Sequence, residues 1–363
     1  MRLGKVPTLV GGAAGLLGAA AVAGIAQQRR TAVRERARID PAVAAELRSP
    51  PVRATEVRTV RTEDGLALHT EQIGPVEAGL TVLFVHGFTL NLRSFHFQRQ
   101  ALSATFGDRV RQLYYDQRSH GRSADSPTED CTIEQLGRDL YRVLDQLVPS
   151  GPIVLVGHSM GGMTVMALAD QHPELFGRDG RVRAVALINT SSGDLRTATL
   201  GLPSALARLP APVLPFVLRG AARNAALVER ARALGRDLAW AVTKRLSFAD
   251  PDVDPAVVEF AARMIEATPV NVVASFYPAL IAHDGSEGVQ NLADCSVLVI
   301  GADSDALTPV SHSERIAAQL PAAQLIITPN SGHLLMLEHP DLVNRPLLAL
   351  VDSALARAGA VPA

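Results

Sequence analysis

A serine flanked by two glycines is the first place where this chain could do chemistry. The pentapeptide Gly-His-Ser-Met-Gly at 157–161 follows the apolar run 152–156 and precedes a helix-compatible segment at 162–170. Between a strand and a helix, a Gly-x-Ser-x-Gly motif makes a sharp turn that strains the serine backbone and exposes its hydroxyl. The glycines carry no side chain that would collide with the returning helix. We therefore interpret Ser159 as a nucleophile that needs a histidine within reach.

The elements around this turn alternate between strand and helix patterns. Continuous apolar runs at 80–85 and ending at 115, 156, 188, 300 and 327 predict strands of a parallel sheet covered on both faces. The segments 57–60 and 66–69, joined through 63–65, predict an antiparallel hairpin. Ile133 to Leu147 carries apolar residues at helical spacing, and Thr132 with Gln135 can form a capping box. The rhythm predicts an α/β fold with a mostly parallel, doubly wound sheet.

The alternation stops between about 191 and 290, where the chain is rich in Ala, Leu, Arg and Pro. Helical patterns occur there at 221–244 and 255–266. We expect an inserted helical lid over 191–290, between two parts of one core at 54–190 and 291–363. Its large apolar side chains must cover the sheet whether or not they also line a pocket: Leu214, Phe216, Trp240, Phe248, Phe260, Phe276 and Tyr277.

The N-terminal residues have a different character from the rest of the chain. Arg2 and Lys5 precede the uncharged stretch 6–26, which is just long enough to span a bilayer as a helix. We expect residues 1–28 to act as a membrane anchor, followed by an Arg-rich linker at 29–53. The excess of positive charge after the stretch favours a cytoplasmic catalytic domain. The small residues at 24–26 also suit a cleaved secretory signal, which would release the protein outside the cell.

Composition limits the partners of the chain. Its 363 residues are 47% hydrophobic, enough for one large core, and the formal net charge is −1. A near-neutral balance gives no basic field for nucleic acid, so we expect no nucleic-acid partner. The two cysteines show neither Cys-x-x-Cys spacing nor a histidine at metal-ligand spacing, and the sequence implies no metal or organic cofactor. The oligomeric state is left open.

Four motifs in order resemble the α/β-hydrolase-fold enzymes, from about residue 54 to the C-terminus. The first is His-Gly-Phe at 86–88, directly after the run 80–85. The second is the loop 116–123, in which Ser119 stands where the family usually has glycine. The third is the turn at Ser159, and the fourth is the strand and loop 297–309 followed by Ser-Gly-His at 331–333. The resemblance implies the family's fold and a triad in the order nucleophile, acid, histidine.

The resemblance assigns a role to each motif. His333 takes the proton of Ser159 and returns it to the leaving group, and a buried carboxylate orients the imidazolium. Asp303 and Asp305 compete for the role of the acid. We expect Asp305, because it stands at the family's usual distance before Pro309, and we interpret Asp303 as a residue that structures the loop.

By the same resemblance, the backbone amides of Phe88 and Met160 form the oxyanion hole. The histidines within these motifs have a simpler interpretation than catalysis. We expect His86 and His158 to brace turns by hydrogen bonding, and His120 with Arg118 to tie its loop to the sheet. Only His333 has catalytic context.

These residues predict a serine hydrolase that cleaves an ester-type bond in a hydrophobic small molecule: a carboxylic ester, thioester, lactone or amide. The same triad serves three alternatives, a cofactor-free haloperoxidase or perhydrolase, a carbon–carbon bond hydrolase and an acyltransferase. An alternative of another class is a non-catalytic, membrane-anchored binding protein on the same scaffold.

Overall fold

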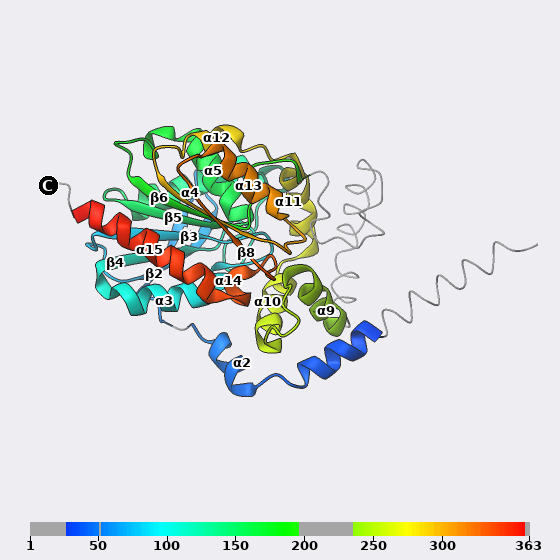
Figure 1. Ribbon diagram of the computed structural model, residues 1–363. Helices are drawn as coiled ribbons and strands as arrows, with labels where there is room; N and C mark the ends of the chain where they lie inside the picture. Colours follow the sequence, from blue (N-terminus) through cyan, green and yellow to red (C-terminus); the bar gives the residue numbers. More distant parts are fainter. Residues whose placement is uncertain (1–26, 51, 196–234, 360–363) are drawn as a thin grey trace, which may run out of the picture.

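A twisted eight-stranded sheet forms the centre of the molecule (Figure 1). The computed structural model describes residues 27–50, 52–195 and 235–359. Along the sheet the order is β1-β2-β4-β3-β5-β6-β7-β8; β2 pairs antiparallel with β1 and β4, and the other pairs are parallel. The strands are β1 Glu56–Arg61, β2 Ala67–Ile73, β3 Leu80–Val85, β4 Val110–Tyr115, β5 Ile153–His158, β6 Val182–Ile188, β7 Ser296–Ala302 and β8 Gln324–Thr328. The predicted α/β class and the N-terminal hairpin are confirmed.

Helices cover both faces of the sheet, as a doubly wound fold requires. The side chains of β3 alternate between two cores: Val82 and Phe84 pack with residues of α3 and α15, and Leu83 and Val85 pack with residues of α4, α5 and α13. These helices are α3 His96–Phe106, α4 Ile133–Leu147, α5 Met160–Gln171, α13 Val310–Gln319 and α15 Pro340–Gly359. Short 3₁₀ turns lie at 92–95, 107–109, 128–130 and 173–175.

The last strand departs from expectation. The apolar run ending at Ile327 predicted a strand buried on both faces, but Leu325 is 38% and Ile327 is 37% exposed. The prediction was wrong here because β8 is the edge strand of the sheet, paired only with β7 within the described residues. An apolar sequence indicates that a segment forms a strand, but whether helices bury both faces of that strand depends on its position in the sheet.

Helices also occupy the described part of the segment between β6 and β7, where a lid was expected over 191–290. They are α9 Arg236–Ser247, α10 Pro255–Ala267, α11 Val270–Ala282 and α12 Ser286–Gln290. Residues 196–234, with Leu214, Phe216 and much of the expected helix 221–244, lie outside the described residues. The short α12 packs on α5 of the core, where Gly288 lies against the carbonyl of Met166. We use the word lid for α9, α10 and α11.

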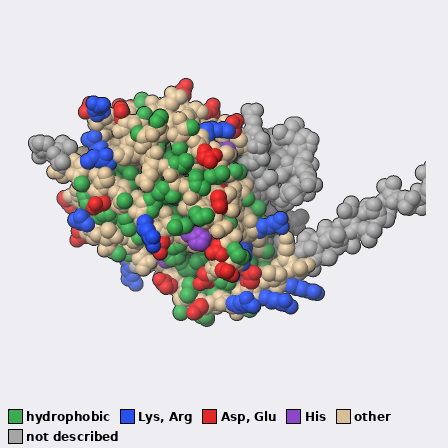
Figure 2. Space-filling view, viewed as in Figure 1, with side chains coloured by type: hydrophobic (Ala, Val, Ile, Leu, Met, Phe, Trp, Pro, Cys, Tyr) green, Lys and Arg blue, Asp and Glu red, His purple; other side chains and the backbone are tan. Residues whose placement is uncertain are grey.

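The Arg-rich segment expected as a linker is folded against this lid. The chain is helical over 27–36, and α2 (Pro41–Arg48) packs against α10. Arg36 pairs with Asp237 at 2.7 Å and with Glu259 at 3.1 Å, and Lys244 pairs with Glu35 at 2.8 Å. Figure 2 shows Lys and Arg side chains gathered at the lower right, over this N-terminal helix. The described residues 29–48 are therefore part of the lid's packing.

The expected anchor at 1–28 falls almost entirely outside the described residues. Within 27–50, 52–195 and 235–359, no single helix is both long and apolar enough to cross a membrane. Together α10 and α11 meet the length and composition criteria, but the pair is bent by 91°.

Candidate active site

The sharp turn at Ser159 joins β5 to α5. Ser159 has φ 51° and ψ −121°, a backbone conformation that L-residues rarely adopt. The neighbouring glycines allow the close approach of strand and helix: a Cβ on Gly157 would lie 2.7 Å from the carbonyl oxygen of Gly161, and one on Gly161 would collide with the carbonyl of Val85. The sequence motif thus produces a strained serine at the start of a helix.

His333 lies beside a buried carboxylate. Its Nδ1 is 2.7 Å from Oδ2 of Asp305, and Asp305 is 5% exposed. The carboxylate also accepts the backbone N–H of Leu307 at 2.7 Å and that of Thr308 at 2.9 Å. Burial acts to raise the pKa of Asp305, but the charge and hydrogen bond of His333 and the bonds from Thr308 outweigh it and hold the pKa below its ordinary value. An ionised Asp305 places the proton on Nδ1, which leaves Nε2 as the basic nitrogen.

Asp303 is placed differently. Its side chain is exposed and accepts the hydroxyl of Ser304 at 2.8 Å, and its Oδ1 lies 3.5 Å from the backbone nitrogen of Ser331. Of the two candidate acids, the structure brings Asp305 to His333 and leaves Asp303 on the outside of the loop.

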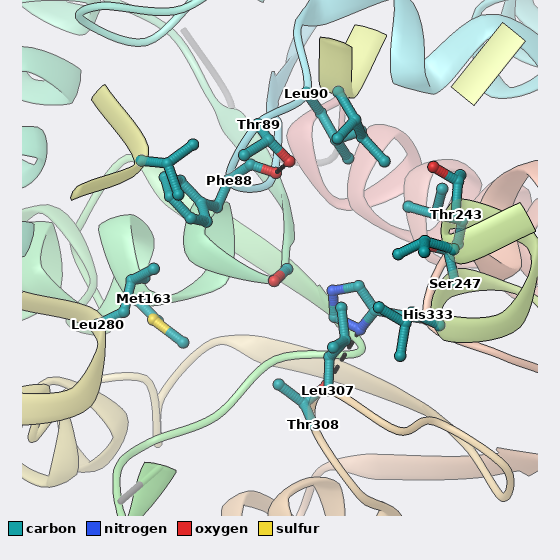
Figure 3. Close-up of a pocket in the computed structure, with 16 residues that line it drawn as sticks. Phe88, Thr89, Leu90, Met163, Thr243, Ser247, Leu280, Leu307, Thr308 and His333 are labelled. Carbon is teal, nitrogen blue, oxygen red and sulfur yellow. Dashed lines mark hydrogen bonds between the residues drawn. The ribbon is translucent and has the colours of Figure 1, made fainter. Parts of the chain in front are cut away.

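Ser159 and His333 line one cavity of about 250 Å³. In Figure 3 the ring of His333 faces the same space as Phe88 and Thr89 on one side and Met163 and Leu280 on another. Most of the lining is aliphatic or aromatic, and the lid supplies much of it. The described lining residues are Phe88, Thr89, Leu90, Ser159, Met163, Val242, Thr243, Leu246, Ser247, Ile265, Val273, Leu280, Leu307, Thr308, His333 and Leu334.

The lid residues that line the cavity are not the large ones singled out in the sequence. Trp240, Phe248 and Phe260 pack into the main core, and Phe276 packs in a smaller cluster with Met160 and Met163. The lining is instead aliphatic, from Val242, Leu246, Ile265, Val273 and Leu280. These side chains lie among many similar Ala, Val and Leu residues, so no sequence signal separated them from core positions.

The two expected oxyanion residues belong to segments next to the serine. Phe88 lines the cavity, and Met160 is the first residue of α5, where backbone N–H groups have no acceptor within the helix. The loop that carries Phe88 touches the turn directly, because a Cβ on Gly87 would lie 2.7 Å from His158 Nδ1 and 3.1 Å from the Cβ of Ser159. The loop therefore packs closely against the serine turn.

Three buried histidines bond to the main chain, as expected of bracing residues. His86 accepts the N–H of Gln117 at 2.9 Å, His158 donates from Nε2 to the carbonyl of His333 at 3.0 Å, and Nδ1 of His120 lies 2.9 Å from the carbonyl of Arg118. Burial lowers the pKa of His86 and of His158 to about 3, and that of His120 to about 4. All three are neutral near pH 7.

Ser119, the departure from the family's loop, occupies the position that explains why glycine is usual. Its φ is 61°, in the left-handed region. Its Oγ accepts the N–H of Ser126 at 2.9 Å, and this bond helps to hold the turn. The adjacent Arg118 is fully buried and pairs with Asp139 at 2.6 Å. The loop is thus kept in place despite the substitution.

Two residues that sequence analysis did not single out hold the histidine loop, residues 331–334. Asn189, directly after β6 with φ 43°, donates from Nδ2 to the carbonyls of Gly332 at 2.9 Å and His333 at 3.0 Å. Glu338, at the end of the short helix α14 (Leu335–Glu338), accepts the N–H of Gly332 at 2.6 Å. The only sequence signal for Asn189 was a single Asn directly after an apolar strand. Glu338 had no sequence signal.

Among the residues that the structure describes, no group of three or more His, Cys, Asp or Glu side chains is arranged to hold a metal ion. Cys131 and Cys295 are free and buried. Burial raises the pKa of the Cys131 thiol to about 11 and that of Cys295 to about 12, so both are protonated near neutral pH.

This fold, with a strained serine and a histidine that line an apolar cavity and a buried aspartate bonded to that histidine, is that of an esterase-like hydrolase. The model of the alpha/beta hydrolase fold family matches residues 81–340, and the chain belongs to that family.

Comparisons with individual proteins agree with this assignment. The chain is 28% identical over 305 residues to the "Putative carbamate hydrolase RutD" of Caulobacter sp. (strain K31), covering 81% of this chain and 98% of the relative. It is 41% identical over 97 residues to an sn-1-specific diacylglycerol lipase of Mus musculus, 27% of this chain and 30% of that protein. A solved thermophilic esterase from Thermogutta terrifontis is similar with a TM-score of 0.62 at 25% identity, over 83% of this chain and 99% of the esterase.

Proposed function

We propose that the protein hydrolyses an ester-type bond of a hydrophobic small molecule through an acyl-enzyme on Ser159. The Oγ of Ser159 attacks the carbonyl carbon while Nε2 of His333 takes its proton, and the oxyanion is stabilised by the amides of Phe88 and Met160. The bond to the leaving group breaks as His333 returns the proton to it. Water then attacks the acyl carbon and gives a proton to His333. The bond between the acyl carbon and Oγ breaks as His333 returns this proton to Ser159, and the acid product leaves.

The observation that carries this proposal is that His333, bonded to the buried Asp305, lines the same cavity as the strained Ser159. The imidazolium formed during attack would be stabilised by an acid that is already ionised and held by two backbone amides.

The lining of the cavity supports an apolar substrate. Apart from the serine and histidine, its polar side chains are hydroxyls of Thr89, Thr243, Ser247 and Thr308. No charged side chain is among the described lining residues, so a charged acyl group would lose its hydration without gaining a partner. We include carbamates among the ester-type candidates because the alignment with the relative named "Putative carbamate hydrolase RutD" covers 98% of that relative.

The test combines labelling with a substrate series. The full chain is treated with a fluorophosphonate, and the adduct is located by mass spectrometry; we expect it on Ser159, lost in Ser159→Ala and His333→Ala. Ser353→Ala, on the exposed face of α15, is the matched control and should label like wild type. Rates for 4-nitrophenyl esters from acetate to octanoate and for aryl carbamates then define the substrate. Hydrolysis retained in Ser159→Ala would refute the mechanism.

We also propose that the segment 6–26 holds the protein on a membrane with the catalytic domain on the cytoplasmic side. Its length and lack of charge support the anchor, and the arginines that follow it support the orientation. Deleting residues 2–26 should move the protein from the membrane to the soluble fraction. A mature protein that begins near Gln27 would instead establish a cleaved signal.

A further inference from the structure

Glu338 touches two segments that are about 80 residues apart in the sequence. Its Oε2 accepts the N–H of Gly332 at 2.6 Å, and its Oε1 accepts the N–H groups of Ala249 and Asp250, each at 2.6 Å. Gly332 precedes His333, whereas Ala249 and Asp250 follow α9 of the lid. We call residues 247–250 the lid turn. One half-buried carboxylate therefore joins the lid turn to the histidine loop.

These two segments are also in direct contact. The N–H of Leu334 donates to the carbonyl of Ser247 at 2.9 Å. A Cβ on Gly332 would lie 2.7 Å from that same carbonyl oxygen and 2.8 Å from the backbone of Phe248. Because there is no space between them, a shift of the lid turn has to be transmitted to the residues on either side of His333.

Both segments contribute to the cavity. Ser247 of the lid turn and Leu246 just before it line one wall, and His333 and Leu334 line the adjoining wall. The core holds the histidine loop from the opposite side, through Asn189 and His158 on the carbonyl of His333. Glu338 is the described side chain that bonds both the lid turn and the histidine loop.

We propose that Glu338 is a positioning residue that couples the lid to His333. The lid side of the cavity, lined by Leu246 and Ser247 and called the lid wall below, and the general base then adopt their catalytic positions together. The inference rests on the proposed function, because it assigns regulation to that same site. Charge makes the coupling strong: bonds from N–H groups to a carboxylate are shorter and stronger than those between neutral partners. Without the carboxylate, the bond from Leu334 to Ser247 is the hydrogen bond that remains between the two segments, and the coupling is weaker.

Glu338→Gln is the sharpest variant, since it keeps the shape of the side chain. An amide has only one acceptor oxygen, and its NH₂ group would face an N–H donor on the other side. Either Gly332 or the pair Ala249 and Asp250 loses its acceptor. The matched control is Glu259→Gln on α10, a half-buried lid carboxylate that bonds Arg36 and Arg263 and has no recorded bond to the histidine loop.

Two kinetic measurements, the rate of Ser159 labelling and the KM for an ester, separate coupling from a simple change in stability. Labelling of Ser159 by a small methyl fluorophosphonate depends on His333 but not on the lid wall, and KM for a hexanoate ester depends on the lid wall. We expect Glu338→Gln to slow labelling and kcat about tenfold, the effect of one lost charged hydrogen bond, and to raise KM for hexanoate more than for acetate. Glu259→Gln should change each by less than about twofold. A Glu338→Gln protein with a lower Tm but unchanged labelling and KM would overturn the proposal.

A second measurement needs no variant and no turnover. In the wild-type full chain, the amides of Ala249, Asp250 and Gly332 should exchange hydrogen with similar protection, because they open as one unit. Protection of Gly332 more than about a hundredfold above that of the other two would show that the segments open separately and would overturn the coupling. If the wild type neither labels nor hydrolyses esters, the proposed function fails, and hydrogen exchange still decides whether the two segments are coupled.

Discussion

The side chain of Asn189 donates to the carbonyl oxygen of His333 at 3.0 Å, from a backbone with φ 43°. The same amide donates to Gly332 at 2.9 Å, and His158 donates to the same carbonyl of His333. Asn189 therefore fixes the backbone of the proposed base without touching the cavity. Asparagine suits this place because it tolerates a positive φ and carries a donor.

We expect Asn189→Gly to lower kcat about tenfold with little change in KM. Glycine accepts the positive φ, so the variant removes the two hydrogen bonds without adding backbone strain. His158 still holds one of the two carbonyls, which limits the loss. Asn330→Gly is the control: Asn330 also has a positive φ, at 50°, but is exposed. Steady-state kinetics on a short ester check this, and equal losses in both variants would contradict it.

Asp305 and Asp303 give a direct comparison of a buried and an exposed carboxylate. Asp305→Asn should lower kcat/KM by about 10³ to 10⁴, because an amide that donates to His333 would favour the wrong tautomer of the ring. Asp303→Asn should change it by less than about threefold, since its carboxylate faces solvent and bonds Ser304. Rates for one ester with both variants check this. A greater loss at Asp303 would assign the acid to that residue instead.

Local patterns predicted the elements well where local forces decide. The helix expected at 133–147 and the strand at 80–85 have those same bounds. The helix carries apolar residues at helical spacing and is capped by Thr132, which accepts the N–H of Gln135, and the strand is a continuous apolar run. The capping box is only half formed, since the side chain of Gln135 instead bonds Asp139 and Arg138. Ser159 could be found because a strained turn needs glycines at fixed spacing.

Contacts between distant segments could not be predicted in this way. Asn189 bonds a backbone carbonyl 143 residues away, and Glu338 bonds a backbone N–H 88 residues away. Nothing in the sequence around either residue depends on those partners. The docking of the Arg-rich segment rests on pairs such as Arg36 with Asp237, which are 201 residues apart. The exposure of β8 follows from the order of strands in the sheet. In each case the tertiary structure, not the local pattern, determines the environment.

The buried histidines predict how stability depends on pH. Burial lowers the pKa of His86 and His158 to about 3 and that of His120 to about 4, and unfolding returns each to near 6.5. Below pH 6.5 the unfolded chain therefore binds more protons than the folded one. We expect these histidines to lower the free energy of unfolding as the pH falls from 6.5 toward 4, by up to about 1.4 kcal/mol per pH unit for each of them.

Urea unfolding between pH 5.0 and 6.5 measures this slope above the range in which exposed carboxylates titrate. His120→Asn should reduce the slope by about one proton, because asparagine does not titrate and can still donate to the carbonyl of Arg118. A free energy of unfolding that stays constant from pH 6.5 to 5.0 would show that these histidines are charged or exposed.

A substitution at Gly87 tests the proposed oxyanion hole by steric displacement of the loop that carries Phe88, without changing any charge. A Cβ at this position would lie 2.7 Å from Nδ1 of His158 and 3.1 Å from the Cβ of Ser159, so the loop that carries Phe88 must move away. We expect Gly87→Ala to lower kcat about a hundredfold, as the loss of one oxyanion donor does. Gly177→Ala is the control, because an added Cβ there meets no atom within 4 Å. An unchanged kcat in a folded Gly87→Ala protein would mean that the Phe88 amide does not bind the oxyanion.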